Sequence, residues 1–372
     1  MQIEPFKLER YFAKYEFSSR YLLSSSDCES ISLSDLLAMA DAEMADLWHE
    51  LKLGYTESWG HPLLREEIAN MYQGVAREDV LTLVPEEGIF LIMHALLAPG
   101  DQVVSTFPGY QSLYEVARAI GCEVTTWEPN EDRGWQFAIS DLEELVTANT
   151  KLVVVNFPHN PTGYLPSQEE FHSLMELVSS RGAYLLSDEM YRFLEIDAGN
   201  RLTAACELYE RAFSLSGLSK LFGLPGLRIG WLASQDHQIL QAVSRLKDYT
   251  TICSSAPSEI LAIIALRNKS KITNQQIERV RKNVAVLDKF FSKFGEHFTW
   301  NRPMGGSICF PRMLQVENTH KFSQQLVADT GIMLAPSSVF QYGDHHVRIG
   351  FGREDMPQVI DLLGKYLVQR FN

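Results

Sequence analysis

The chain has 372 residues, a formal net charge of −14 and a sequence pI near 5.2. Its 45% of hydrophobic and 22% of charged residues are typical of a globular protein, and the length favours two domains with sizeable cores. The acidic balance argues against nucleic acid or an anionic membrane as a partner, because both repel a negatively charged surface.

The cysteines and the N-terminus bear on the cellular compartment. Five cysteines are scattered along the chain, and none forms a CxxC pair (Cys28, Cys122, Cys206, Cys253 and Cys309). This spacing favours neither a disulfide framework nor a zinc site and is typical of reduced thiols. The first residues lack the apolar core of a signal peptide, and no apolar run approaches the length of a membrane span. We therefore expect a cytoplasmic protein without a metal site.

The first 72 residues predict short helices separated by irregular chain. Apolar residues recur at helical spacing over residues 34–51, and helices are also expected over residues 8–15 and 64–72. An irregular segment is expected over residues 23–30. Tyr55 precedes the third helix, where a lone tyrosine is more often a core or interface residue than a ligand.

Residues 80–97 predict a strand, a sharp turn and a helix. After the strand, Pro85, Glu86 and Glu87 open an apolar helix that runs to Leu97. The first turn of a helix has backbone N–H groups without partners, so this turn can bind an anion. Two carboxylates beside an anion are tolerable only if their side chains point away from it.

A further strand, helix and strand are expected between residues 100 and 127. The turn after the first of these strands carries Tyr110, the helix runs to Ile120, and the next strand covers residues 122–127. Strands that alternate with helices are typical of a parallel sheet with helices on both faces.

Two buried strands end near polar side chains. The apolar run 151–155 is followed by a turn that carries Asn160, and the run 184–187 ends at Asp188, three residues before Tyr191. Open α/β sheets place ligands at the carboxyl ends of their strands. A buried carboxylate is unfavourable unless it is paired, so we expect Asp188 to meet a cationic partner there.

The most informative stretch is residues 216–231, which read SGLSKLFGLPGLRIGW. Lys220 lies among small and apolar residues, where desolvation shifts an amine toward its neutral, nucleophilic form. Arg228 follows eight positions later, and a guanidinium can hold two oxygens of a phosphate. For an arbitrary lysine and arginine, a turn with two surface cations is the commoner explanation. A nucleophilic lysine with a phosphate anchor is what pyridoxal phosphate requires.

The pattern changes after Trp231. Helices are expected over residues 236–268, 274–295, 318–330 and 356–366, with short strands near residues 298–300, 306–310, 332–336 and 346–351. Arg348 lies in the last of these strands, and Arg353 beyond it is interpreted as a surface charge.

These motifs and their order resemble those of the class I/II aminotransferases, which are fold type I enzymes that use pyridoxal 5′-phosphate (PLP). The segment around Lys220 is similar to the family's Ser-x-Ser-Lys-x-Phe-Gly-Leu-Pro-Gly-x-Arg-x-Gly-Trp motif, and the Asn-Pro turn at Asn160 is a second match. The segment that begins at Tyr55 resembles the family's Tyr-x-x-x-x-Gly-x-x-x-Leu-Arg sequence.

The resemblance implies a set of contacts to the cofactor ring. Lys220 would hold PLP as a Schiff base, and Asp188 would pair with the protonated ring nitrogen. Tyr110 would stack on the ring, while Asn160 and Tyr191 would hydrogen-bond its 3′ oxygen.

It also implies contacts to the phosphate. The phosphate would lie against Arg228 and the backbone of Glu86 and Glu87, and Tyr55 would reach it from the neighbouring subunit of a homodimer. Carboxylates are unusual at these two positions of the family.

Gly217 departs from the family, which usually has a serine there. Ser219 or Ser216 would then supply the phosphate-binding hydroxyl. Arg348 matches the family's arginine that binds the α-carboxylate of the substrate as a bidentate fork.

The fold implied by the resemblance is α/β, with a fold type I large domain and a smaller α+β domain. The large domain would cover residues 46–265 and contain a mostly parallel seven-stranded sheet flanked by helices. Residues 1–45 and 266–372 would form the small domain, and the N-terminal arm would lie over the mouth of the active site, where Asp27, Cys28 and Glu29 would face the substrate.

The implied reaction is the transfer of an amino group between an α-amino acid and a 2-oxo acid. β-Elimination or a capreomycidine-synthase-like cyclisation would use the same residues, and the acidic pair Asp27 and Glu29 would suit a cationic substrate side chain. A remote alternative is a non-catalytic PLP-binding regulatory domain, which predicts a DNA-binding segment or a basic face. The strongly acidic composition disfavours that alternative.

Overall fold

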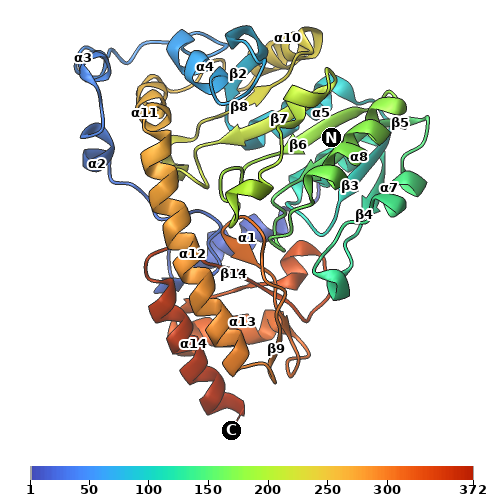
Figure 1. Ribbon diagram of the computed structural model, residues 1–372, viewed down its shortest axis with the longest axis vertical. Helices are drawn as coiled ribbons and strands as arrows, with labels where there is room; N and C mark the ends of the chain where they lie inside the picture. The colour runs from blue at the N-terminus through green and yellow to red at the C-terminus, as the bar shows by residue number, and fades with distance from the viewer. Residues whose placement is uncertain (1, 372) are drawn as a thin grey trace.

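A seven-stranded sheet forms the centre of the computed structural model, which describes residues 2–371 (Figure 1). The strand order is β2-β8-β7-β6-β5-β3-β4, and only β8 runs antiparallel to its neighbours. The strands are β2 (Val80–Leu83), β3 (Gln102–Thr106), β4 (Glu123–Trp127), β5 (Thr150–Asn156), β6 (Tyr184–Asp188), β7 (Ala212–Gly217) and β8 (Gly230–Ala233). The predicted mostly parallel α/β sheet is confirmed.

The central strands are buried on both faces, as their continuous apolar sequences require. In β5, Leu152 and Val154 pack into the core on one face, whereas Val153 and Val155 pack into the core on the other. Helices α5 (Pro85–Leu96), α6 (Ser112–Ile120) and α10 (His237–Lys247) cover the first face, and α7 (Ile139–Leu145) and α8 (Gln168–Ser180) cover the second.

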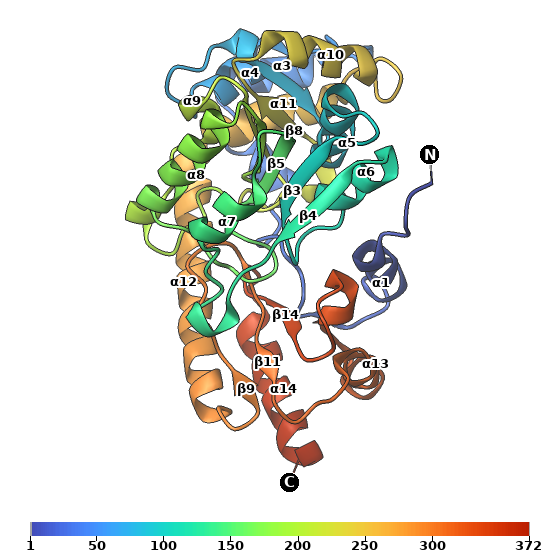
Figure 2. The same cartoon turned by 90° about the vertical axis from the view of Figure 1, so that its right-hand side faces the viewer.

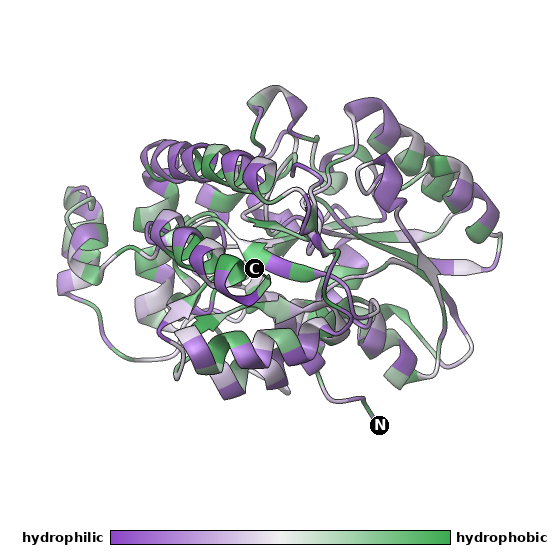
Figure 3. Cartoon of the chain, turned by 90° about the horizontal axis from the view of Figure 1, so that it is seen from below, coloured by the Kyte–Doolittle hydropathy of each residue, from purple (hydrophilic) through white to green (hydrophobic). Residues whose placement is uncertain are grey.

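A long helix joins the sheet to the C-terminal part of the chain. Helix α12 (Lys269–Lys293) follows α11 (Ala256–Arg267) and descends beside α14 (Met356–Phe371) (Figure 1). Seen from below, α14 carries both hydrophobic and hydrophilic residues along its length (Figure 3). Its apolar side packs with that of α12 in one core. Within residues 2–371, no helix has the length and apolar character that a membrane crossing needs.

The C-terminal part contains short strands and one further helix, α13 (Thr319–Thr330). The strands are β9 (Phe298–Thr299), β10 (Ile308–Cys309), β11 (Arg312–Met313), β12 (Ile332–Met333), β13 (Ala335–Pro336) and β14 (Val347–Gly350). The N-terminal arm joins this part, because β1 (Tyr21–Leu22) pairs with β12 and the Tyr11 hydroxyl donates to the Leu334 carbonyl at 2.8 Å. Figure 2 shows α1 (Lys7–Tyr15) beside α13. The division into domains of residues 46–265 and 1–45 with 266–372 stays a prediction.

Two predicted helices are wrong in extent. The helix expected over residues 34–51 is two short helices, α2 (Leu33–Leu37) and α3 (Ala42–His49), and Ser32 is the N-cap of α2. The helix expected over residues 236–268 is α10 and α11, because Pro257 lies in the first turn of α11 and lacks the N–H that a continuous helix would use.

The remaining helical segments are short. They are α4 (Pro62–Ala69), α9 (Ala205–Leu208) and five 3₁₀ turns at Arg77–Asp79, Glu131–Arg133, Ala198–Asn200, Pro225–Leu227 and Ser337–Phe340.

Candidate active site

A cavity of about 410 Å³ lies where the carboxyl ends of the parallel strands face the arm and the C-terminal part. Asp188 is the last residue of β6, and Lys220 follows the end of β7 by three residues. The cavity brings together nine of the eleven predicted site residues, namely Glu86, Tyr110, Asn160, Asp188, Tyr191, Ser219, Lys220, Arg228 and Arg348. It does not include Glu87 or Tyr55.

Lys220 is half-buried, and its amine is held by the N-terminal arm. Its Nζ donates a hydrogen bond of 2.8 Å to Ser26 Oγ, and its backbone carbonyl accepts from the Cys28 N–H at 3.0 Å. The arm is therefore fixed to the lysine at two adjacent points. Ser26 had not been singled out from the sequence, because the irregular segment that carries it shows no pattern pointing to Lys220.

Asp188 is buried beside Lys220. Burial raises the pKa of its carboxyl from 3.8 to about 7, although the backbone N–H of Met190 and the charge of Lys220 oppose the shift. The Met190 N–H donates to its Oδ1 at 3.1 Å. Asp188 forms no ion pair within residues 2–371, and a cationic group in the cavity would stabilise its charged form.

The hydroxyl of Tyr191 is suited to binding a ligand. Its hydroxyl is buried and has no hydrogen-bond partner within residues 2–371, although a buried hydroxyl without a partner is unfavourable. A group in the cavity that hydrogen-bonds this hydroxyl would remove the penalty. The 3′ oxygen expected of PLP fits this requirement.

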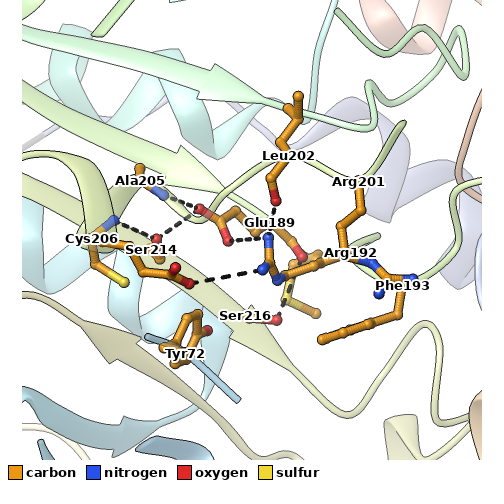
Figure 4. A network of polar contacts seen from close by, with 12 residues as sticks. Tyr72, Glu189, Arg192, Phe193, Arg201, Leu202, Ala205, Cys206, Ser214 and Ser216 are labelled. Atoms are coloured by element: carbon orange, nitrogen blue, oxygen red, sulfur yellow. Dashed lines mark hydrogen bonds and ion pairs between the residues drawn. The ribbon is translucent and has the colours of Figure 1, made fainter. Parts of the chain in front are cut away.

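Glu189 and Arg192, which are neighbours of Asp188 and Tyr191 in the chain, belong to a buried polar network after β6. The Glu189 side chain points away from the cavity. Its Oε1 accepts from Ser214 Oγ at 2.7 Å and from the Ala205 N–H at 2.9 Å (Figure 4). Arg192 lies 3.9 Å from Glu189 and donates to the Leu202 carbonyl.

At the first turn of α5, the side chains of Glu86 and Glu87 point in different directions, so only one of the two points away from the expected anion. Glu87 points away, since its Oε1 accepts from the hydroxyls of Thr250 and Thr251. Glu86 instead lines the cavity, because adjacent helical residues point in different directions. Burial raises the pKa of Glu86 from 4.5 to about 7, and Ser112 Oγ donates to it at 3.2 Å. A protonated Glu86 carries no charge to repel an anion.

The glycine that replaces the expected serine has no space for a side chain. A Cβ at Gly217 would lie 2.9 Å from the Pro85 ring and 3.2 Å from Gly230 Cα. Ser219 lines the cavity, whereas the Ser216 hydroxyl donates to the Glu189 carbonyl at 3.5 Å. Of the two candidate hydroxyls, the structure therefore places only Ser219 in the cavity.

Arg228 shares this end of the cavity with the first turn of α5. It has a positive φ of 50°, which is uncommon for a residue with a side chain. The first intrahelical bond of α5 runs from the Gly88 N–H to the Val84 carbonyl, so the N–H groups of Glu86 and Glu87 precede it and remain without helical partners. These donors and the guanidinium fit a phosphate.

Tyr110 is connected to the arm. Its hydroxyl donates to Glu9 Oε1 at 2.9 Å, and its ring lies 4.8 Å from that of Phe6. Burial raises the pKa of this phenol well above its usual value, so it stays protonated and donates.

Arg348 is almost fully buried at the base of the cavity. Its Nε and Nη2 donate to the Ser24 carbonyl, and its Nη1 donates to Asn160 Oδ1 at 3.3 Å. The guanidinium carbon lies 5.5 Å from the centre of the Phe12 ring and 5.4 Å from that of Phe340, and the guanidinium forms no ion pair within residues 2–371. A carboxylate in the cavity would be a suitable partner.

Arg353 had been interpreted as a surface charge, and this interpretation is wrong. Arg353 lines the cavity and donates to Asp27 Oδ2 at 2.8 Å.

The expectation that Asp27, Cys28 and Glu29 of the arm face the substrate is met only in part. Asp27 faces the cavity, but Cys28 is buried in the core and Glu29 turns away to accept from the Glu354 N–H. Glu9 and Glu16, which were not singled out, line the cavity instead.

Tyr55 lies outside the cavity of its own chain. Its side chain is 91% exposed, in the segment that joins α3 to α4. The predicted contact of Tyr55 with a neighbouring active site stays a prediction.

The sheet topology and the cavity together define a class of protein, the fold type I PLP enzymes, and the comparison with known families agrees. A family model described as aminotransferase class I and II matches residues 23–363, and the chain belongs to this family. Family members depend on PLP and act on amino-acid substrates.

Known relatives cover almost the whole chain. It is 29% identical to capreomycidine synthase of Streptomyces vinaceus over 346 residues, which are 92% of this chain and 88% of that protein. The structure of a PLP-dependent aminotransferase from Streptococcus suis 89-1591 is similar with a TM-score of 0.93 and 29% identity, covering 100% of this chain and 99% of that one. The PLP-dependent cyclase OrfR has a TM-score of 0.90 at 28% identity, covering 100% and 98%.

Proposed function

We propose that this chain is a PLP-dependent aminotransferase that moves an amino group between an α-amino acid and a 2-oxo acid. One observation carries the proposal, namely that Lys220, Asp188, Tyr191 and Arg228 line a single cavity in which the Tyr191 hydroxyl has no partner among residues 2–371. PLP, when bound, supplies an aldehyde that takes up the substrate amine and a cationic ring that withdraws electrons from Cα.

Each side chain has a part in holding the cofactor. Lys220 would be the point of covalent attachment, and ionised Asp188 would keep the proton on the ring nitrogen. Tyr191 and Asn160 would hydrogen-bond the 3′ oxygen, and the ring of Tyr110 would stack on the cofactor.

The phosphate would be held at the opening of α5. The donors would be Arg228, Ser219 and the N–H groups of Glu86 and Glu87, and the positive end of the α5 dipole would add to the attraction. Protonation of Glu86 removes the repulsion that its carboxylate would cause.

The substrate is oriented by Arg348 and deprotonated by Lys220. Arg348 binds the α-carboxylate, which fixes the direction of the Cα–H bond. With the cofactor in place, the Lys220 amine would act as the base that removes the proton from Cα of the substrate and as the acid that gives it back. Ser26 orients that amine through its hydrogen bond.

A cyclisation is the second candidate, and the similarity to capreomycidine synthase and to the cyclase OrfR favours it. The residues named above serve both reactions, so the products decide between them. In the absence of a 2-oxo acid acceptor, an aminotransferase releases about one equivalent of 2-oxo acid per active site and then stops. A cyclase continues to turn over and releases no 2-oxo acid.

The experiment is product analysis by mass spectrometry with a panel of amino acids. We expect Lys220→Ala to lose turnover, whereas Lys289→Ala, an exposed lysine on α12, keeps it. Continued turnover to a cyclic product would replace aminotransfer by cyclisation. Turnover by the Lys220→Ala variant would contradict both candidates.

A further inference from the structure

The cavity contains more carboxyl groups than the proposed chemistry uses. Five line it, and two of them, Asp188 and Glu86, lie beside the expected ring nitrogen and phosphate. The other three, Glu9, Glu16 and Asp27, come from the N-terminal arm. None of the proposed contacts to the cofactor or to the α-carboxylate of the substrate uses them.

The cations of the cavity do not neutralise these three acids. Lys220, Arg228 and Arg348 are used by the cofactor and by the α-carboxylate of the substrate. Arg353 remains, and it forms an ion pair of 2.8 Å with Asp27. The other two acids, Glu9 and Glu16, form no ion pair within residues 2–371. The arm therefore presents a net negative charge to the cavity.

The three acids are close enough to affect one another. Burial raises the pKa of Glu16, and the charges of Asp27 and Glu9 raise it further, while Arg353 and Lys220 oppose the shift. Carboxylates that repel one another in a partly desolvated place are unfavourable unless a cation joins them.

An independent observation indicates that this cavity is built for an amino acid as well as for the cofactor. The guanidinium of Arg348 lines the same cavity, is almost fully buried and forms no ion pair within residues 2–371. A substrate whose α-carboxylate meets Arg348 would place its side chain among the remaining groups of the cavity, which include the acids of the arm.

We propose that the substrate is an α-amino acid with a cationic side chain, an ammonium or a guanidinium group, which is bound by Glu16 and Asp27 with Glu9 nearby. The inference rests on the proposed function, because it assumes that Arg348 holds the α-carboxylate. An anionic side chain would have to take Arg353 from Asp27 and would then lie beside Glu16. A neutral side chain would leave Glu16 without an ion-pair partner within residues 2–371, while Glu9 would keep only its hydrogen bond from Tyr110.

The test compares amino acids that differ in the charge of the side chain, and L-arginine and L-citrulline are matched in size. Dissociation constants are measured from the absorbance of the holoenzyme on addition of L-arginine, its neutral analogue L-citrulline, L-lysine, L-norleucine and L-glutamate. We expect L-arginine and L-lysine to bind about tenfold or more tightly than L-citrulline and L-norleucine, and L-glutamate to bind most weakly. Equal affinities for the five amino acids, or tightest binding of L-glutamate, would overturn the proposal with the wild-type protein alone.

Variants then connect the preference to the arm. Glu16→Gln and Asp27→Asn each reduce the preference for L-arginine over L-citrulline by about tenfold, whereas Glu4→Gln, an exposed acid of the same arm, leaves it unchanged. A preference that survives Glu16→Gln and Asp27→Asn together would also overturn the proposal. If the variants lose the preference but their absorbance still responds to all five amino acids, the proposed function is unaffected. A protein whose Lys220 carries no cofactor overturns the proposed function itself.

Discussion

The amine of Lys220 is positioned by a single hydroxyl from a distant part of the chain. Ser26 lies 194 residues before Lys220 in the sequence and accepts its hydrogen bond at 2.8 Å. The Ser26 backbone carbonyl in turn accepts from Ser307 Oγ at 2.6 Å. The lysine is therefore oriented by the arm, and the arm is fixed by the C-terminal part.

Removal of this hydroxyl tests its positioning role. We expect Ser26→Ala to lower kcat about tenfold with KM nearly unchanged, because the amine loses the hydroxyl that orients it for proton transfer. Ser26→Thr keeps the hydroxyl and should restore kcat. The measurements are steady-state kinetics and urea unfolding of the three proteins. A loss of kcat that Ser26→Thr does not restore, or that a matching loss of stability accompanies, would indicate a merely structural role.

Asp188 makes the stability of the cofactor-free protein depend on pH. Its folded pKa of about 7 lies above its ordinary value of 3.8, so the stabilisation is present at low pH and is lost as pH rises toward 7. Between pH 5 and 7.5 we expect wild type to lose on the order of 2 kcal/mol more unfolding free energy than Asp188→Asn. Urea unfolding at both pH values measures the difference. Parallel losses in the two proteins would contradict the assignment.

The sequence predicted the site residues that follow strands better than those that come from the arm. Asp188, Asn160 and Lys220 lie at or beyond strand ends, where topology brings side chains together. Glu16 and Ser26 enter the cavity only because the arm folds back across it, and no local pattern encodes that path. Arg353 was misjudged for the same reason, since its partner Asp27 lies 326 residues away.

At the scale of secondary-structure elements, the contact between β7 and the opening of α5 decides which hydroxyl can enter the cavity. Gly217 and Gly230 face each other across the pair β7–β8, and the Pro85 ring packs against both positions. A side chain at Gly217 has no space there, so the hydroxyl in the cavity belongs to Ser219.

A serine at position 217, where the family usually has one, should therefore destabilise the protein. We expect Gly217→Ser to lower the unfolding free energy by about 1–3 kcal/mol, because its Cβ overlaps the Pro85 ring. Gly226→Ser is the matched control, since a Cβ at Gly226 meets no atom within 4 Å. The measurement is urea unfolding of the cofactor-free proteins. Equal stability of the two variants would show that β7 and α5 can move apart.

The sheet was predictable because its strands are continuous apolar runs bounded by turns. The boundaries of the helices were less predictable. Apolar periodicity continues through residues 236–268, yet the loop of residues 248–255 leaves the helix and brings Thr250 and Thr251 to Glu87. This contact forms between distant segments, and periodicity carries no information about it.

At the scale of the whole molecule, exposed apolar side chains gather near Tyr55. Leu53 and Tyr55 lie between α3 and α4, and Tyr249 and Ile252 lie in the loop between α10 and α11. The Thr56 hydroxyl joins the two segments by donating to the Ser254 carbonyl at 3.1 Å. Such a patch is typical of a protein interface.

We predict a homodimer in which Tyr55 reaches the phosphate of the neighbouring subunit. Tyr55→Phe should keep the dimer and weaken cofactor binding about tenfold, because one hydrogen bond to a charged group is lost. Tyr366→Phe, on the distant α14, should leave cofactor binding unchanged. Sedimentation equilibrium and cofactor titration measure both properties. A monomer with full cofactor affinity would contradict the prediction.

The central claim is that Lys220 binds PLP covalently opposite Asp188. The most direct measurement is borohydride reduction of the purified, PLP-loaded protein, followed by proteolysis and mass spectrometry of the labelled peptide. The account predicts a single pyridoxyl group on the peptide that contains Lys220. An unlabelled protein, or a label on any other lysine, would contradict it.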